Sequence, residues 1–207
     1  MQIIPAKTPG FVKTLFPNLV WNINTTAKEL FLTFDDGPTP QVTEWVLDIL
    51  KTYNAKATFF CIGSNVEKYP NIFNRIVEEG HVVGNHTYQH LNAWQHNAED
   101  YMADVDLASK HIHSKLFRPP YGKLKITHGK HLLSLNYKII MWDVLSFDWD
   151  AMVAPKKCSQ NVIEKAKPGS IVVFHDSLKA ENNLKYALLK VLNHFSECGF
   201  QFKAIHN

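Results

Sequence analysis

Cysteine and long apolar runs are both scarce in this sequence, and their scarcity excludes several classes of protein. The 207 residues include only three cysteines, Cys61, Cys158 and Cys198, which form no CxxC pair and no Cys/His pattern. We therefore predict free thiols, with neither a disulfide framework nor a cysteine-ligated metal. No apolar run reaches the ~18 residues that a membrane-spanning helix needs, so no transmembrane segment is expected.

Excess charge is also absent. The chain has 22 basic and 19 acidic residues, a formal net charge of +3, and no block of Lys or Arg. A nucleic-acid partner is therefore not predicted. The N-terminus lacks the basic start and continuous apolar stretch of a secretory signal, so we expect the chain as given in the cytoplasm, or outside the cell if a leader was removed. Nothing in the sequence indicates an oligomeric state.

The length and the 45% hydrophobic content suit a single domain with one buried core. Residues 1–28 are interrupted by Pro5, Pro9, Gly10 and Pro17 and are predicted to form an irregular N-terminal lead-in. Residues 29–207 are predicted to form the folded domain.

From residue 29 onward, short β-rich runs alternate with segments of helical spacing. We predict helices within 42–53, 70–80, 101–116 and 184–199. We predict strands at 30–34, 57–62, 81–83, 116–118, 137–142, 170–174 and 200–205. This alternation indicates an α/β fold with a parallel sheet. The chain is short for a regular barrel of about 250 residues, so a distorted or incomplete (β/α) barrel of about seven strands is predicted. A doubly wound open sheet is the alternative.

Polar side chains occur where the predicted strands end. The residues concerned are Asp35, Asp36, His86, Arg118 and His175. In a parallel barrel the carboxyl ends of the strands meet on one face, where active sites are found. The sequence therefore predicts that these distant residues form one site.

His86 and His90 are four residues apart, a spacing that places two imidazoles on one face of a helical turn. With one carboxylate they would form a three-ligand set, which leaves open positions on a catalytic metal ion. Because the chain has eleven histidines, such a pair could arise by chance. Its position just after a strand favours the metal site.

The other polar groups each have an ordinary alternative. Asp35 and Asp36 precede Gly37-Pro38 and could belong to a surface turn. Arg118 precedes two prolines, a rigid setting that suits holding a carboxylate, although a surface ion pair is as common.

His175 follows a continuous apolar strand and could be a hydrogen-bonded core residue, and Asp148 lies beside the aromatic Trp149. We assign no role to Asp143, Asp150 or Asp176.

Together these motifs resemble the polysaccharide deacetylases of the NodB-homology type, carbohydrate esterase family 4. The motifs, in family order, are Thr33–Pro38, His86–His90, Arg118–Gly122, Asp148–Trp149 and Val173–His175. The resemblance extends over residues 29–205, makes residues 29–207 the catalytic domain, and implies the family's distorted (β/α) barrel.

The resemblance implies a metal ion held by Asp36, His86 and His90. Asp35 would be the catalytic base, and Arg118 would orient it. One divalent cation is expected, with zinc as the first choice and cobalt, nickel or manganese as alternatives for the same donors.

The resemblance also implies the remaining roles. The backbone N–H of Tyr121 would help to bind the oxyanion, and His175 would be the general acid with Asp148 as its charge partner. Trp149 and Val173 would line the pocket for the acetyl methyl group.

The predicted function is metal-dependent removal of acetyl groups from N-acetylated sugars of a chitin, peptidoglycan or exopolysaccharide type. The alternatives are a hydrolase of another linear or cyclic amide and a non-catalytic carbohydrate-binding relic.

Overall fold

Parallel strands make up the sheet in residues 5–206, the part of the chain that the computed structural model describes. The strands are β1 (Glu29–Asp35), β2 (Thr58–Cys61), β3 (Val82–Asn85), β4 (Leu116–Phe117), β5 (Lys138–Ile139), β6 (Val144–Leu145), β7 (Ile171–His175) and β8 (Gln201–Phe202). Seven pair in the order β5-β4-β3-β2-β1-β7-β6, and the short β8 pairs with the start of β1.

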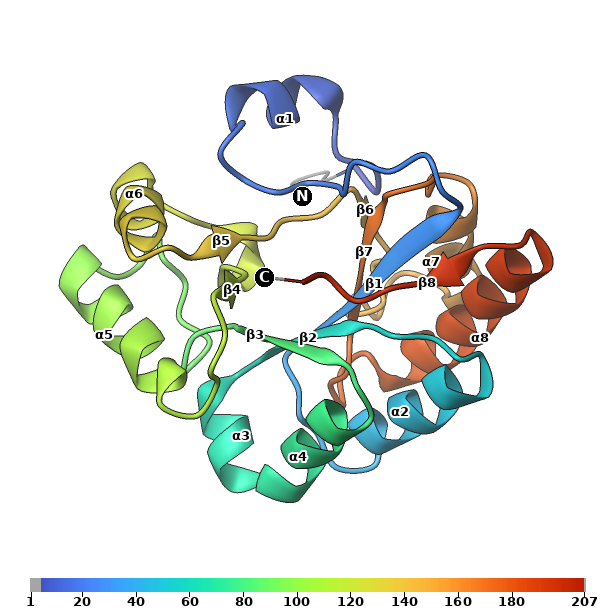
Figure 1. Cartoon of the computed structure of the whole chain (residues 1–207), viewed down its shortest axis with the longest axis horizontal. Coiled ribbons are helices and arrows are strands. Elements are labelled where there is room, and N and C mark those ends of the chain that lie inside the picture. Colours follow the sequence, from blue (N-terminus) through green and yellow to red (C-terminus); the bar gives the residue numbers. More distant parts are fainter. Residues whose placement is uncertain (1–4, 207) are drawn as a thin grey trace.

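The sheet curls round on itself and the helices lie outside it (Figure 1). The helices are α1 (Gly10–Leu15), α2 (Val42–Thr52), α3 (Gly63–Lys68), α4 (Pro70–Glu78), α5 (Ala98–Ser109), α6 (Ile126–Ser134), α7 (Pro155–Ile163) and α8 (Glu181–Glu197), with a 3-10 turn, η1 (Pro120–Gly122). The strand order continues in one direction around the curl. This is the predicted incomplete barrel of about seven strands, and not the doubly wound open sheet.

Helix boundaries follow local signals in the sequence. Pro70 begins α4, and Gly80 follows its end with a φ of 77°. Gly199 likewise follows α8 with a φ of 76°. Glycine adopts such left-handed angles without steric cost, so it ends a helix efficiently. These predicted helix ends are confirmed.

Three predicted elements were clearly too long. The strand predicted over 200–205 is limited to Gln201–Phe202. The helix predicted over 101–116 ends at Ser109, although Ile112 and Leu116 beyond it are fully buried. Their apolar spacing reflects burial in a turn and in β4 and not a continuing helix. The strand predicted over 137–142 is limited to Lys138–Ile139, and the prediction missed β6.

The lead-in lies between β5 and β6 (Figure 1). Val20 forms a parallel bridge with Ile140, next to β5, and Lys7 forms an antiparallel bridge with Val144 of β6. Although its sequence is irregular, this segment contains α1. It pairs with the barrel where the sheet is incomplete.

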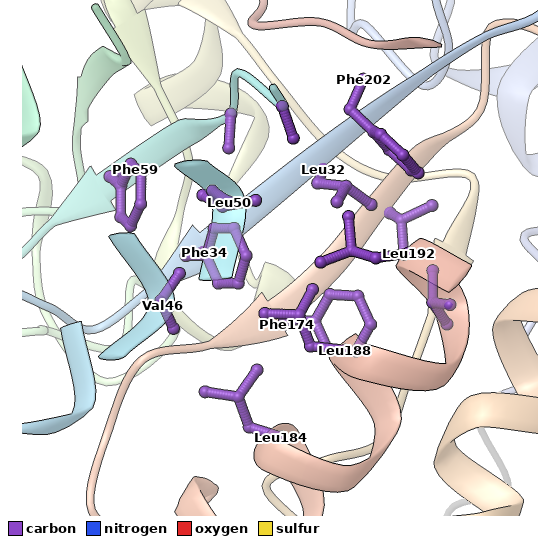
Figure 2. Packing of buried hydrophobic residues seen from close by; sticks show 14 of the residues in the cluster. Leu32, Phe34, Val46, Leu50, Phe59, Phe174, Leu184, Leu188, Leu192 and Phe202 are labelled. Carbon is purple, nitrogen blue, oxygen red and sulfur yellow. The ribbon is translucent and has the colours of Figure 1, made fainter. Parts of the chain in front are cut away.

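Side-chain alternation along β1 divides the core into two parts. Leu30, Leu32 and Phe34 pack with the surrounding helices, whereas Phe31 belongs to a separate cluster with Phe60. Figure 2 shows the first part, in which residues of β1, β2 and β7 meet residues of α2 and α8. The Phe34 ring stacks on that of Phe59 at 5.0 Å between centroids. Asp35 follows Phe31 at an even spacing, so its side chain faces the inside of the barrel.

The three cysteines are free thiols, as predicted. Among the helices within residues 5–206, none combines the length and the apolar character that crossing a bilayer requires.

Candidate active site and metal centre

The two adjacent aspartates at the end of β1 reach the same site because the strand ends between them. Asp35 is the last residue of β1, and Asp36 has a φ of 81°. Consecutive side chains of a strand point in opposite directions, but a left-handed residue breaks this alternation. The strand end therefore provides two nearby carboxylates in different surroundings.

Asp36, His86 and His90 form a potential three-ligand metal cluster. One ligand atom from each side chain lies within 4.8 Å of the others. The Oδ1 atom of Asp36 is 3.2 Å from Nε2 of His90 and 3.7 Å from Nε2 of His86. Burial raises the pKa of Asp36, but the His90 hydrogen bond and the nearby histidine charges lower it further, to below its usual range. The carboxylate is therefore ionised, as a metal ligand must be.

The two histidines lie on a loop and not on the helical turn that their spacing suggested. Thr87 and His90 have φ angles of 63° and 57°, which no α-helix contains. The Asn85 side chain accepts the Thr87 N–H at 2.8 Å, and Asp104 Oδ2 accepts the next two backbone N–H groups. These side chains replace helical hydrogen bonds. The loop still directs both imidazoles towards Asp36.

The other ring nitrogen of His86 bonds a backbone carbonyl. Its Nδ1 lies 2.7 Å from the carbonyl oxygen of Arg118. A carbonyl can only accept, so Nδ1 carries the proton and the Nε2 lone pair faces Asp36. Burial lowers the pKa of His86 to about 4, so the ring is neutral at pH 7.

Arg118 fixes Asp35 from inside the barrel. Both side chains are buried, and the Arg118 Nη1 donates to Asp35 Oδ1 and to Thr33 Oγ1, each at 2.7 Å. The other donors of the guanidinium bond the carbonyls of Ile140 and Met141, at 3.1 and 2.9 Å. Since four hydrogen bonds direct its guanidinium at fixed acceptors, Arg118 holds Asp35 in one position.

His175 and Asp148 form a second charged pair. Nδ1 of His175 lies 2.9 Å from Asp148 Oδ1, and the His175 backbone N–H donates to Oδ2 at 2.8 Å. Burial alone would lower the pKa of His175, but the Asp148 carboxylate and the nearby Asp36 and Asp35 raise it to about 9. The imidazole is therefore protonated at pH 7, with Nε2 available to transfer a proton.

The three residues expected to contact substrate lie beside these groups. The Tyr121 hydroxyl is 3.1 Å from Nδ1 of His90, and its backbone N–H donates to no acceptor within residues 5–206. Tyr121 has a φ of 59°, an uncommon value that is often found at functional sites. The Trp149 ring is 4.7 Å from that of His175, and Val173 precedes His175 by two residues on the same face of β7.

Asp176 supports the site, although its sequence position did not single it out. This fully buried carboxylate accepts the Gly37 N–H at 3.1 Å and the Thr43 hydroxyl at 2.5 Å. A Cβ on Gly37 would lie 2.0 Å from Asp176 Oδ2, so only glycine fits there. Burial raises the pKa of Asp176 to about 7. The sequence feature that could have indicated this role is the position of Asp176, a second polar residue directly after His175.

Asp143 and Asp150 lie elsewhere. Asp143 pairs with Lys7 and Lys13 of the lead-in, and Asp150 accepts the Met152 N–H in a turn.

The family model described as polysaccharide deacetylase matches residues 22–140. A peptidoglycan-N-acetylglucosamine deacetylase of Bacillus cereus is 39% identical over 72% of this chain, which spans 56% of that relative's length. A chitooligosaccharide deacetylase of Azorhizobium caulinodans is 33% identical over 74% of this chain and 76% of its own.

Solved structures agree with this. One of a peptidoglycan N-acetylglucosamine deacetylase superimposes with a TM-score of 0.84 and 33% identity, over 96% of this chain and 95% of its own. One of a pseudoenzyme from Bacillus anthracis gives a TM-score of 0.77 and 26% identity, over 89% of this chain and 66% of its own. The solved peptidoglycan N-acetylglucosamine deacetylase matches over nearly all of both chains, and the family model covers more than half of this chain. The chain belongs to the polysaccharide deacetylase family.

Proposed function

We propose that this protein is a metal-dependent deacetylase that hydrolyses the acetamide of N-acetylated sugars in a glycan. One observation carries the proposal: a buried, Arg-held carboxylate and a protonated histidine lie beside a potential three-ligand metal cluster. Amide hydrolysis needs a base for water and an acid for the leaving amine, and Asp35 and His175 have these two properties.

Asp36, His86 and His90 would hold the metal ion. One carboxylate oxygen and two neutral imidazole nitrogens suit a divalent cation and leave coordination positions for water and substrate. When bound, the ion would polarise the acetyl carbonyl and lower the pKa of water from about 15.7 towards roughly 7 to 9. Zinc is our first choice for this donor set, and cobalt, nickel or manganese would also fit it.

Asp35 would take the proton of the attacking water. Its Oδ1 is held by Arg118, whereas its Oδ2 accepts no hydrogen bond from residues 5–206. The free oxygen can therefore accept a proton while the carboxylate keeps its position. A positioned base of this kind typically contributes about 10²–10⁴-fold to the rate.

The rest of the reaction would use Tyr121 and His175. The unpaired backbone N–H of Tyr121 would donate to the oxyanion, and loss of one such donor typically costs about 10²–10³ in rate. His175 would then give its Nε2 proton to the amine as the C–N bond breaks. Trp149 and Val173 would pack against the acetyl methyl group.

Two relatives are a peptidoglycan-N-acetylglucosamine deacetylase and a chitooligosaccharide deacetylase, which supports a glycan as the substrate. The competing candidates are another linear or cyclic amide and a non-catalytic relic, for which the family has a precedent in the pseudoenzyme. Asp35 and His175 argue against the relic, because binding alone requires no acid and base.

An acetate-release assay separates these possibilities. We expect release from N-acetylglucosamine oligomers or peptidoglycan fragments, loss of activity with a chelator, and recovery when a divalent metal is added back. Turnover of cyclic ureides without acetate release would favour the other amide. Activity that a chelator leaves unchanged would contradict the metal assignment, and inactivity on every compound would favour the relic.

A further inference from the structure

Two segments run side by side away from the potential metal cluster. One follows His90, and the other begins at Tyr121. They make three successive contacts: the His90 and Tyr121 rings, 4.6 Å between centroids; Lys123 Nζ over the Trp94 ring, 5.1 Å from its centroid; and Lys125 Nζ with the His96 carbonyl, 2.6 Å. Because the first contact contains a proposed metal ligand, the second lies just outside the catalytic centre.

Trp94 is held at the surface by an ordered loop. Its side chain is 58% exposed, while its neighbour Ala93 is fully buried in the core. The Trp94 N–H donates to the Asn92 side-chain oxygen at 3.0 Å, and the Gln95 N–H donates to the Asn92 carbonyl at 2.9 Å. A single exposed aromatic is unremarkable by itself. This one, however, lies on the segment that follows His90 and is contacted by Lys123, two residues after Tyr121.

Lys123 supplies a positive charge at the same place. Its ammonium group lies over the Trp94 ring, and no ion pair within residues 5–206 involves Lys123. Its charge is therefore available to an anionic group on a ligand. An exposed ion pair between Lys123 and such a group would be weak and sensitive to salt. It would therefore select between ligands more than it would provide affinity.

The distance suits a neighbouring unit of a glycan. Trp94 comes four residues after His90, so their Cα atoms are at most about 14 Å apart even if the loop were fully extended. The C–H face of a pyranose packs on an indole much as other apolar groups do. If the acetamide lies at the metal cluster, as the proposed function requires, the next sugar reaches Trp94.

We propose that Trp94 and Lys123 form a subsite for the sugar next to the one that is deacetylated, and that this subsite favours a sugar with a carboxylate-bearing substituent. Glycan strands of peptidoglycan have such a substituent on alternate sugars, whereas chitin oligomers are neutral. The subsite would therefore direct the enzyme towards the peptidoglycan type of glycan.

The test compares two oligosaccharides of equal length in acetate release. One is a neutral N-acetylglucosamine oligomer, and the other is a peptide-free peptidoglycan strand with free lactyl carboxylates. Trp94→Ala is expected to raise KM about 10-fold for both, with kcat within about twofold, and Trp94→Phe is expected to restore most of the loss. Lys123→Met is expected to raise KM about 3-fold for the carboxylated strand alone, an effect that added salt removes.

Tyr186 and Lys190 provide matched controls. They form a similar exposed aromatic–lysine pair on α8, with Nζ 5.9 Å from the ring centroid. Tyr186→Ala and Lys190→Met make the same chemical changes away from the site and are expected to leave both KM values unchanged. Thermal melting of all variants checks that the fold is retained.

The inference and the proposed function can fail separately. If the wild-type protein releases acetate but Trp94→Ala leaves KM unchanged, or Lys123→Met affects both oligomers equally, the subsite is wrong and the activity stands. Calorimetric titration of the carboxylated strand into chelator-treated wild-type protein and both variants tests binding without turnover. Equal affinities there overturn the subsite even if no acetate is released.

Discussion

Two buried carboxylates of this protein, Asp35 and Asp143, are both paired with cations but differ in how many of their oxygens accept hydrogen bonds. Asp143 has both oxygens occupied, since Oδ1 accepts from Lys13 at 2.5 Å and Oδ2 accepts from Lys7 at 2.6 Å and Ser170 at 2.5 Å. Asp35 has one oxygen bonded to Arg118 and one without a hydrogen bond in the described part of the chain. A carboxylate with both oxygens hydrogen-bonded serves only to stabilise the structure. A carboxylate with one oxygen free of hydrogen bonds can also exchange a proton.

The cations differ as well. Arg118 is fully buried, and its rigid fork bonds several fixed acceptors, so it positions its partner. Lys7 and Lys13 are partly exposed, and their flexible side chains attach the lead-in to the barrel. The comparison predicts that changes at Asp35 affect the reaction and changes at Asp143 affect stability.

The largest expected effect comes from Asp35→Asn. The amide keeps the shape but cannot take a proton at neutral pH, so kcat/KM is expected to fall by about 10²–10⁴-fold. Metal content of the purified variant, measured by elemental analysis, is expected to match wild type because Asp35 is not in the cluster. Near-normal activity would show that Asp35 is not the base.

His86→Ala is expected to abolish both activity and metal binding. It removes one of three proposed ligands, and its loss leaves only Asp36 and His90. Calorimetric titration with zinc measures the affinity directly. Asn65→Ala is a control, because Asn65 bonds the Asp36 carbonyl without belonging to the cluster. Retained zinc affinity in His86→Ala would contradict the assignment.

Asp148→Asn is expected to change the pH profile of activity. The general acid must be protonated, and the Asp148 charge helps to raise the pKa of His175 to about 9. Without that charge, burial lowers the His175 pKa, so the alkaline fall in kcat moves to lower pH. About a tenfold loss is expected for each unit by which the new pKa lies below the assay pH. An unchanged alkaline limb would mean that another group donates the proton.

The smallest effect on activity is expected from Asp143→Asn. Loss of charged hydrogen bonds is expected to lower the free energy of unfolding by about 1.5–3 kcal/mol, measured with urea, while kcat stays within about twofold. Burial raises the Asp143 pKa, but Lys13, Lys7 and Ser170 lower it further, so it lies below its usual range. The contribution of the Asp143 carboxylate to the free energy of unfolding is thus present above about pH 4 and is lost as the pH falls further. Normal stability with impaired turnover in Asp143→Asn would contradict the structural role assigned to Asp143.

Much of the fold could be predicted because each strand and helix has a local pattern. The alternation of β-rich and helical segments, together with signals such as Pro70 and Gly80, depends only on nearby residues. The predictions that were wrong involved partners distant in the sequence. The helix predicted over 101–116 ends at Ser109, and Leu116 lies in β4, where the strand predicted over 116–118 had placed it. The His86–His90 spacing suggested a helix where Asp104 instead stabilises a loop.

By itself, the sequence determined the fold class, the placement of polar residues at strand ends, and the residue types available for acid, base and metal chemistry. The tertiary structure alone decided which groups meet and in what charge state. Arg118 and Asp35 are 83 residues apart, and His175 and Asp148 are 27 apart. Burial and charge act through space and not along the chain, so the half-bonded Asp35 and the protonated His175 could only be recognised once the barrel had brought their partners together.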